Sequence, residues 1–117
     1  MSAREFPVGR GGTAHEAGEG QKPAGGDLVD IGKYIAARNL DAAMRFLRAA
    51  EEDFAKLAAM PGMGPACDFA IPNLAGLRSY PITGFRNYLT YYLPGRGGIT
   101  VIRVLHGARD VGPLLGN

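Results

Sequence analysis

Four side chains that could do chemistry stand close together near the end of the chain: Arg103, His106, Arg109 and Asp110. Arginine binds anions, and histidine changes its charge near neutral pH, so such a cluster could hold an anion or move a proton. Gly107 follows the histidine, where we expect a turn with a positive φ that a side chain would disfavour. This stretch is therefore the first candidate for catalysis or recognition.

The same residues also have a structural interpretation, which we favour. Arg103 has apolar neighbours on its predicted strand, so it needs an acidic partner if it is buried. Asp110 is the nearest acid in the sequence, and we predict an Arg103–Asp110 pair that braces the turn, with Arg109 facing outward. His106 is interpreted as a hydrogen-bonded residue at a strand end, with catalysis as the alternative. Together with Gly107, these residues would form the rim of a recognition surface.

Metal and cofactor chemistry find little support in the sequence. The chain has two histidines, His15 and His106, without metal-ligand spacing, and its single cysteine, Cys67, excludes an internal disulfide and a cysteine cluster. The glycines of residues 1–26 match neither GxxxxGK[ST] nor GxGxxG. We expect no metal site and no cofactor.

The elements that must position the cluster begin with two helices. Apolar residues at spacings of three and four predict a helix over residues 27–38. Asn39 is the predicted N-cap of a second helix, which must end before Pro61. Its apolar stripe comprises Ala43, Phe46, Leu47, Ala50, Phe54 and Leu57. The short link between the two helices predicts an antiparallel hairpin.

Three strands are predicted after the helices, over residues 77–81, 86–93 and 99–106. In the last strand, alternation places Arg103 on one face with Ile99, Val101 and Leu105, and puts Thr100, Ile102, Val104 and His106 on the other. A strand that is apolar on both faces needs two covers, and the helices supply one. We expect a partner chain to cover the second face. The alternative is that residues 111–117 fold back with Val111, Leu114 and Leu115.

The first part of the chain differs in composition from the remainder. Residues 1–26 hold seven glycines and few large apolar side chains, so we interpret them as a flexible segment, in which Arg4 to Val8 is a candidate edge strand despite Pro7. Residues 27–117 are predicted to form a single domain. Its fold class is α+β, with the helix hairpin packed on an antiparallel sheet of three, or with the candidate strand four, strands.

Charge is distributed unevenly along this domain. Residues 27–68 carry a net charge of −2 and residues 69–117 a net charge of +4. An anionic partner would be steered to the second half, and a solvated basic face is the alternative. No signal-peptide core and no membrane-spanning run occurs. We therefore expect a soluble cytoplasmic protein that makes no membrane contact.

Several phrases of the sequence resemble a known family. DLVDIGKYIAARN, FAKLAAMPGMG and LRSYPITGFRNYLTYYLPGRGGITVIRVLHGARD are similar to the RelE/ParE toxin superfamily of type II toxin–antitoxin systems, and within it to the ParE branch. The similarity covers about residues 27–111 in unbroken order. One departure stands out: the family's first strand runs almost directly into the first helix, whereas residues 1–26 take that place here. The sheet either lacks this strand or obtains it from Arg4 to Val8 through a long linker.

The resemblance implies a role as well as a fold. A ParE-like toxin would poison DNA gyrase, contribute to plasmid stabilisation, and be neutralised by a ParD-like antitoxin in a hetero-oligomer. It would act by binding, without chemistry of its own and without specific DNA binding by this chain. The alternative from the same superfamily is a ribosome-dependent mRNA endonuclease of the RelE type. His106 would then be the acid or base, Arg86, Arg103 and Arg109 would surround the phosphate, and Tyr88 would position a base.

Two further observations bear on this choice. The nuclease members place a catalytic group near their C-terminus, whereas residues 111–117 hold no aromatic, acidic or basic side chain, and no lysine follows Lys56. We therefore favour the gyrase-binding interpretation. A second alternative is a degenerate toxin that only binds antitoxin, because its first strand is displaced.

Overall fold

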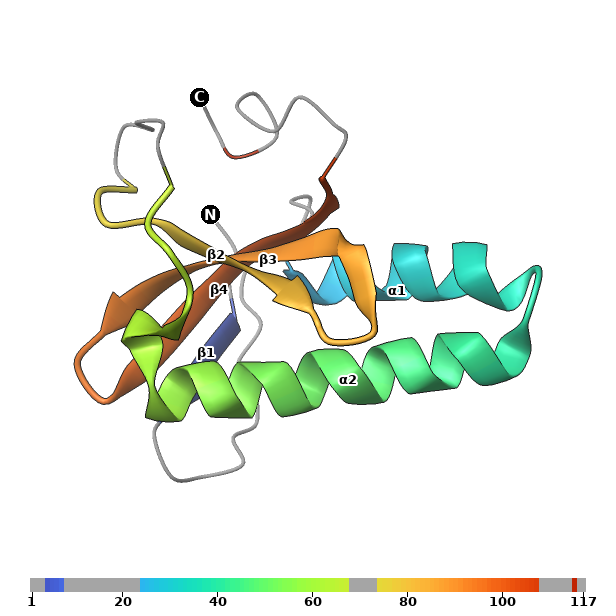
Figure 1. The fold of residues 1–117 in the computed structure, drawn as a ribbon, viewed down its shortest axis with the longest axis horizontal. Coiled ribbons are helices and arrows are strands. Elements are labelled where there is room, and N and C mark those ends of the chain that lie inside the picture. Colours follow the sequence, from blue (N-terminus) through green and yellow to red (C-terminus); the bar gives the residue numbers. More distant parts are fainter. Residues whose placement is uncertain (1–3, 8–23, 68–73, 108–114, 116–117) are drawn as a thin grey trace.

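A computed structural model describes residues 4–7, 24–67, 74–107 and 115. The helices are α1 (Ala24–Ala36) and α2 (Leu40–Ala59), followed by a short 3-10 helix, η1 (Pro61–Met63). The strands are β1 (Arg4–Pro7), β2 (Arg78–Ile82), β3 (Phe85–Gly95) and β4 (Gly98–His106). They form one antiparallel sheet in the order β1-β4-β3-β2. Figure 1 shows the two helices running alongside each other on one side of this sheet.

The predicted α+β architecture is confirmed, and the sheet has its fourth strand. β1 pairs with the first part of β4, from Arg4 opposite Val101 to Pro7 opposite Gly98. Proline is tolerated here because β1 is an edge strand, and no further strand on its outer side needs a hydrogen bond from the missing N–H. The segment from Arg4 thus takes the place of the strand that the resemblance requires.

α1 begins at Ala24 and ends at Ala36, somewhat earlier at both ends than the predicted residues 27–38, whereas α2 begins after Asn39 and ends before Pro61 as predicted. The side chain of Asn39 accepts a hydrogen bond from the N–H of Ala42 at 2.9 Å, so the predicted N-cap is confirmed. The predicted stripe of α2 is buried with one exception. Leu47 is 37% exposed, because it follows Phe46 by one residue and points toward α1 instead of the sheet.

Both faces of the sheet are covered by residues of this chain. On the helix side a core is formed mainly by Leu28, Phe46, Phe54, Leu57, Ile82, Tyr92, Ile99, Val101 and Val104. A second cluster of buried residues comprises Leu74, Leu77, Tyr91, Ile102, Leu105 and Leu115. The prediction that a partner chain covers the second face is therefore wrong. Leu115 is 1% exposed, as the alternative with a folded-back tail requires; Val111 and Leu114 lie outside the described residues.

The predicted alternation along β4 is also wrong beyond Val101. Val104 belongs to the helix-side core with Val101, whereas Leu105 belongs to the second cluster with Ile102. The cause is a register shift in the β3–β4 pairing, where Tyr91 pairs with Arg103 but the next residue, Tyr92, pairs with Val101. One extra residue in a strand exchanges the faces of all residues after it.

Thr90, in the centre of β3, offers a test of the packing. Its side chain is fully buried, and its hydroxyl finds no hydrogen-bond partner in the described structure. A buried, unpaired hydroxyl is destabilising, so Thr90→Val is expected to raise the free energy of unfolding by about 1 kcal/mol in a denaturant titration.

Thr83→Val is the matched control, because the hydroxyl of Thr83 donates to the Asp53 carboxylate at 2.8 Å. This substitution is expected to lower the free energy of unfolding by about 1 kcal/mol. Equal changes in unfolding free energy for Thr90→Val and Thr83→Val would contradict the conclusion that only the Thr83 hydroxyl makes a stabilising hydrogen bond.

Candidate functional site

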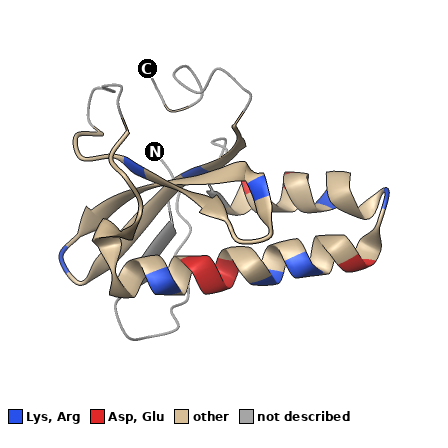
Figure 2. Ribbon diagram, in the orientation of Figure 1, with Lys and Arg blue, Asp and Glu red and all other residues tan. Residues whose placement is uncertain are grey.

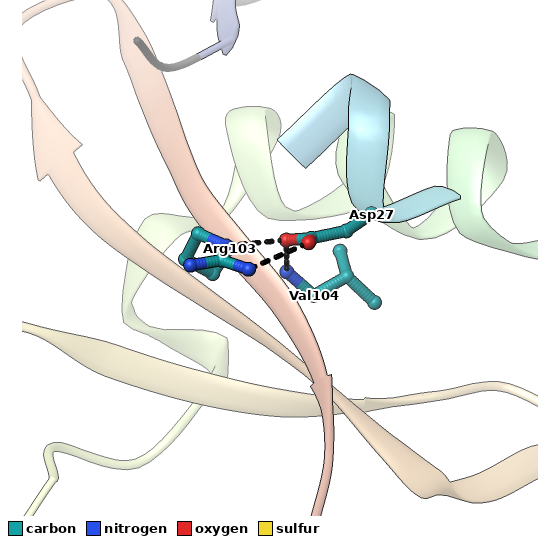
Figure 3. A network of polar contacts seen from close by, with 3 residues as sticks. All are labelled: Asp27, Arg103 and Val104. Carbon is teal, nitrogen blue, oxygen red and sulfur yellow. Dashed lines mark hydrogen bonds and ion pairs between the residues drawn. The ribbon is translucent and has the colours of Figure 1, made fainter. Parts of the chain in front are cut away.

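The predicted site residue Arg103 is held by an acid from the other end of the domain. Its Nε donates to Asp27 Oδ2 at 2.7 Å and its second terminal nitrogen donates to Asp27 Oδ1 at 2.8 Å. The two side chains are 15% and 4% exposed. Figure 3 shows the carboxylate from α1 meeting the guanidinium beside β4. Such two-point pairing fixes both direction and distance and is the strongest geometry of an arginine–carboxylate pair.

Asp27 also binds the backbone of β4. The N–H of Val104 donates to Asp27 Oδ2 at 2.9 Å. β1 pairs with β4 only up to Val101, so beyond that point the edge of β4 has no neighbouring strand among the described residues. An unpaired N–H on a buried edge is costly, and the carboxylate removes that cost. Asp27 thus accepts a hydrogen bond from β4 just beyond the residues that pair with β1.

The predicted Arg103–Asp110 pair is not tested, because Arg109 and Asp110 lie outside the described residues. The partner that the structure does show is 76 positions away in the sequence. Proximity along the chain could not point to Asp27, and the pair with Asp110 stays a prediction. A useful signal was available: Asp27 lies in the first turn of α1, a helix that had to pack against the last strand, and both residues need a buried partner.

His106 and Tyr88, two of the predicted site residues, lie side by side on neighbouring strands. They are cross-strand partners, and their rings meet edge to face with centroids 5.2 Å apart. Phe46 continues the cluster, with its centroid 5.4 Å from that of Tyr88. Burial raises the pKa of the Tyr88 phenol, and the nearby Tyr34 raises it further, so Tyr88 is neutral at neutral pH. Its described contacts are those of a packed aromatic side chain.

Gly107 differs from its prediction. Its φ is not positive; among the described glycines, Gly76, Gly84, Gly97 and Gly98 have positive φ. The N–H of Gly107 donates to the carbonyl of Asn87 at 2.6 Å, which continues the β3–β4 pairing past His106 and holds the backbone. A Cβ at Gly107 would lie 3.4 Å from that carbonyl oxygen, which is about van der Waals contact distance.

The predicted nuclease residues are only partly assembled in the described structure. Arg86 is exposed near the start of β3, two residues from Tyr88. Arg103 is bound to a carboxylate, whereas phosphate binding would need that guanidinium. In the parts of the chain that are described, no three His, Cys, Asp or Glu residues gather to hold a metal ion. Neither α1 nor α2 has the length and apolarity to cross a membrane.

Comparison with known families agrees with this fold. The model of the ParE toxin of type II toxin–antitoxin systems, parDE, matches residues 21–111. The chain belongs to the ParE toxin family. No curated protein sequence matches it at a significant level. Membership of the ParE family implies the role of a toxin with an antitoxin partner. The match begins before α1 and ends after β4, so it includes Asp27, Arg103 and the aromatic cluster.

The structure also shows a groove that was not predicted from the sequence. It lies between α1 and α2 and has a volume of about 540 Å³. Val29, Leu40 and Met44 line it and are 53%, 68% and 54% exposed. The exposed Leu47 also lines the groove, so its apolar surface is continuous. The spacing of Leu40, Met44 and Leu47 was a signal in the sequence, because residues four and three apart share one side of a helix.

Charged residues stand at the edges of this groove. Lys33 of α1 and Glu51 of α2 line it together with the apolar side chains. Figure 2 shows basic and acidic positions following one another along α2. Asp41 and Arg45 form one exposed pair there, with 3.0 Å between carboxylate oxygen and Nε. The groove therefore offers an apolar floor with one positive and one negative group.

The Asp27 clamp can be tested by stability. Asp27→Ala removes the acceptor of both Arg103 and the Val104 N–H, and it leaves a largely buried guanidinium without this carboxylate. The expected loss is roughly 2–4 kcal/mol of unfolding free energy, toward the lower part of the range for broken buried pairs because Arg103 keeps some contact with water.

Asp41→Ala is the control, because it breaks the exposed Asp41–Arg45 pair. It should cost less than about 1 kcal/mol. Urea titrations of the three proteins provide the comparison. A similar small loss for both variants would show that the Asp27 clamp does not stabilise the fold.

Proposed function

We propose that this ParE-family protein inhibits growth by binding DNA gyrase and poisoning it. One observation carries the proposal: the guanidinium of Arg103 is held by Asp27 instead of facing a substrate. Arg103 is one of the arginines that the nuclease interpretation would place around the phosphate. An arginine that forms a largely buried ion pair braces the fold and does not neutralise a phosphate in a transition state.

The rival nuclease interpretation needs a proton-transfer group and cations around one phosphate. His106 is the available proton-transfer group, but its ring packs against Tyr88 in an edge-to-face contact. Arg86, two residues before Tyr88, is exposed. Residues 111–117 supply no further acid, base or aromatic ring. These features support a protein that recognises its target by contact.

The two functions give opposite results in defined assays. Purified protein is expected to block supercoiling by gyrase and to increase cleaved DNA, while mRNA in a translating extract stays intact. His106→Ala is expected to keep the gyrase inhibition, because the imidazole does no chemistry in this account. Codon-positioned cuts in mRNA that disappear in His106→Ala would establish the nuclease instead.

The antitoxin is proposed to be ParD-like and to dock in the groove between α1 and α2. The second sheet face is covered within this chain, so the groove is the large apolar surface that stays open among the described residues. An amphipathic helix fits such a groove, with its apolar residues on the floor. An acidic side chain could face Lys33 and a basic one Glu51. Antitoxin and toxin would then form a hetero-oligomer.

Met44→Glu tests this docking surface. Met44 is 54% exposed in the groove, so a glutamate there is tolerated by the free toxin but places a charge within the apolar contact. We expect affinity for the antitoxin encoded beside this protein to fall at least about tenfold in calorimetry.

Ala55→Glu is the matched control, because Ala55 is an exposed residue of the same helix outside the groove. It should bind antitoxin as the unaltered protein does. Unchanged affinity for Met44→Glu, or an equal loss in both variants, would place the antitoxin elsewhere.

A further inference from the structure

Two of the methionines that the structure describes are largely exposed to water. Met44 of α2 is 54% exposed, and Met60, which directly follows α2, is 63% exposed. Met63 of η1 is partly buried and packs against the helix-side core. Exposure gives an oxidant in water access to the thioether sulfur, whereas packing restricts that access. Met44 and Met60 are therefore the described methionines that an oxidant reaches most readily.

The surroundings of Met44 differ from those of Met60. Met44 lines the groove between α1 and α2 together with Val29, Leu40 and Leu47. Met60 lies outside this groove, and its N–H donates to the carbonyl of Lys56 at 2.9 Å where α2 ends. An oxygen atom added to Met44 would thus enter an apolar surface, whereas one added to Met60 would lie away from it.

Oxidation of a methionine by a peroxide transfers two electrons and one oxygen atom. The sulfur attacks one oxygen of hydrogen peroxide, an S–O bond forms, and the O–O bond breaks. The second oxygen leaves as water with both hydrogen atoms of the peroxide. The sulfur is oxidised and the peroxide is reduced. The product, methionine sulfoxide, is a polar side chain in place of an apolar one.

We propose that Met44 is a redox-sensitive contact, at which oxidation by peroxide to the sulfoxide weakens the hold of the antitoxin on the toxin. This inference rests on the proposed docking of the antitoxin in the groove. An apolar helix face laid on Met44 would bury the sulfoxide oxygen away from water, which is unfavourable without a hydrogen bond. Bound antitoxin covers Met44, so peroxide acts on the free toxin and hinders its neutralisation. Methionine sulfoxide reductases reverse the oxidation.

Calorimetric titration with the antitoxin, before and after treatment of the full chain with hydrogen peroxide, tests the proposal. Mass spectrometry locates the added oxygen. Protein oxidised at Met44 is expected to bind at least about fivefold more weakly, and treatment with methionine sulfoxide reductase to restore its affinity. Met44→Gln places an amide in the groove without any oxidation and is expected to show a similar loss.

Two leucine variants assign the effect to one sulfur atom. Met44→Leu keeps an apolar side chain of similar volume, so peroxide should leave its affinity unchanged. Met60→Leu is the matched control, which keeps Met44 and should lose affinity after peroxide as the unaltered protein does. Both variants retain Cys67, so an effect of thiol oxidation would appear in both. Unchanged affinity of protein oxidised at Met44, or a loss that persists in Met44→Leu, overturns the proposal.

The Met44→Glu variant separates this inference from the docking proposal on which it rests. A weakened Met44→Glu together with unchanged affinity of the oxidised protein overturns the redox-sensitive contact alone. Normal affinity of Met44→Glu overturns both, because the antitoxin then binds elsewhere. Gyrase inhibition plays no part in these measurements.

Discussion

The carboxylate of Asp27 binds three N–H groups of the last strand, and the arrangement of the domain depends on it. Two belong to the side chain of Arg103 and one to the backbone of Val104. β1 is short and pairs only with the first half of β4, so the remaining edge needs another acceptor. Asp27 supplies it from the first turn of α1. The same contact joins the helix hairpin to the sheet and withdraws Arg103 from solvent. Asp27 thus does two things: it binds the part of β4 that the short β1 leaves unpaired, and it holds the Arg103 side chain of the candidate site in an ion pair.

Local patterns predicted the elements well, because each has its own signal. Asn39 marks the start of α2, Pro61 follows its end, and the glycine-rich turns separate β-branched and aromatic strands. The fold class followed from the order of these elements. The sheet face on which each residue lies after the bulge in β4 could not be predicted. One inserted residue reverses the alternation of the side chains, and the amino-acid composition gives no signal for it. The second face of the sheet was wrongly predicted to need a partner chain. A few apolar residues outside the strands, Leu74, Leu77 and Leu115, belong to the buried cluster on that face.

The structure brings some of the candidate site residues together. The sequence drew attention to Arg103, His106 and Tyr88, and the last two do lie together. It could not identify Asp27 as a partner of Arg103, because an ion pair between residues 76 positions apart depends on how a helix docks on the sheet. The groove between α1 and α2 was missed for another reason. Leu47 was counted as core, although its position beside Phe46 turns it toward the neighbouring helix, where it joins an exposed apolar surface.

In the proposed function, Arg103 braces the fold and does not act on a substrate or target. The double variant Asp27→Asn/Arg103→Gln tests it directly, because asparagine keeps an acceptor for the Val104 N–H and can accept from the glutamine amide, while both charges are removed. Growth arrest is measured after induction without antitoxin, and circular dichroism verifies that the variant is folded. The account predicts that the folded double variant arrests growth as the unaltered protein does. A folded double variant that no longer arrests growth would contradict it, because the guanidinium itself would then be needed at the target.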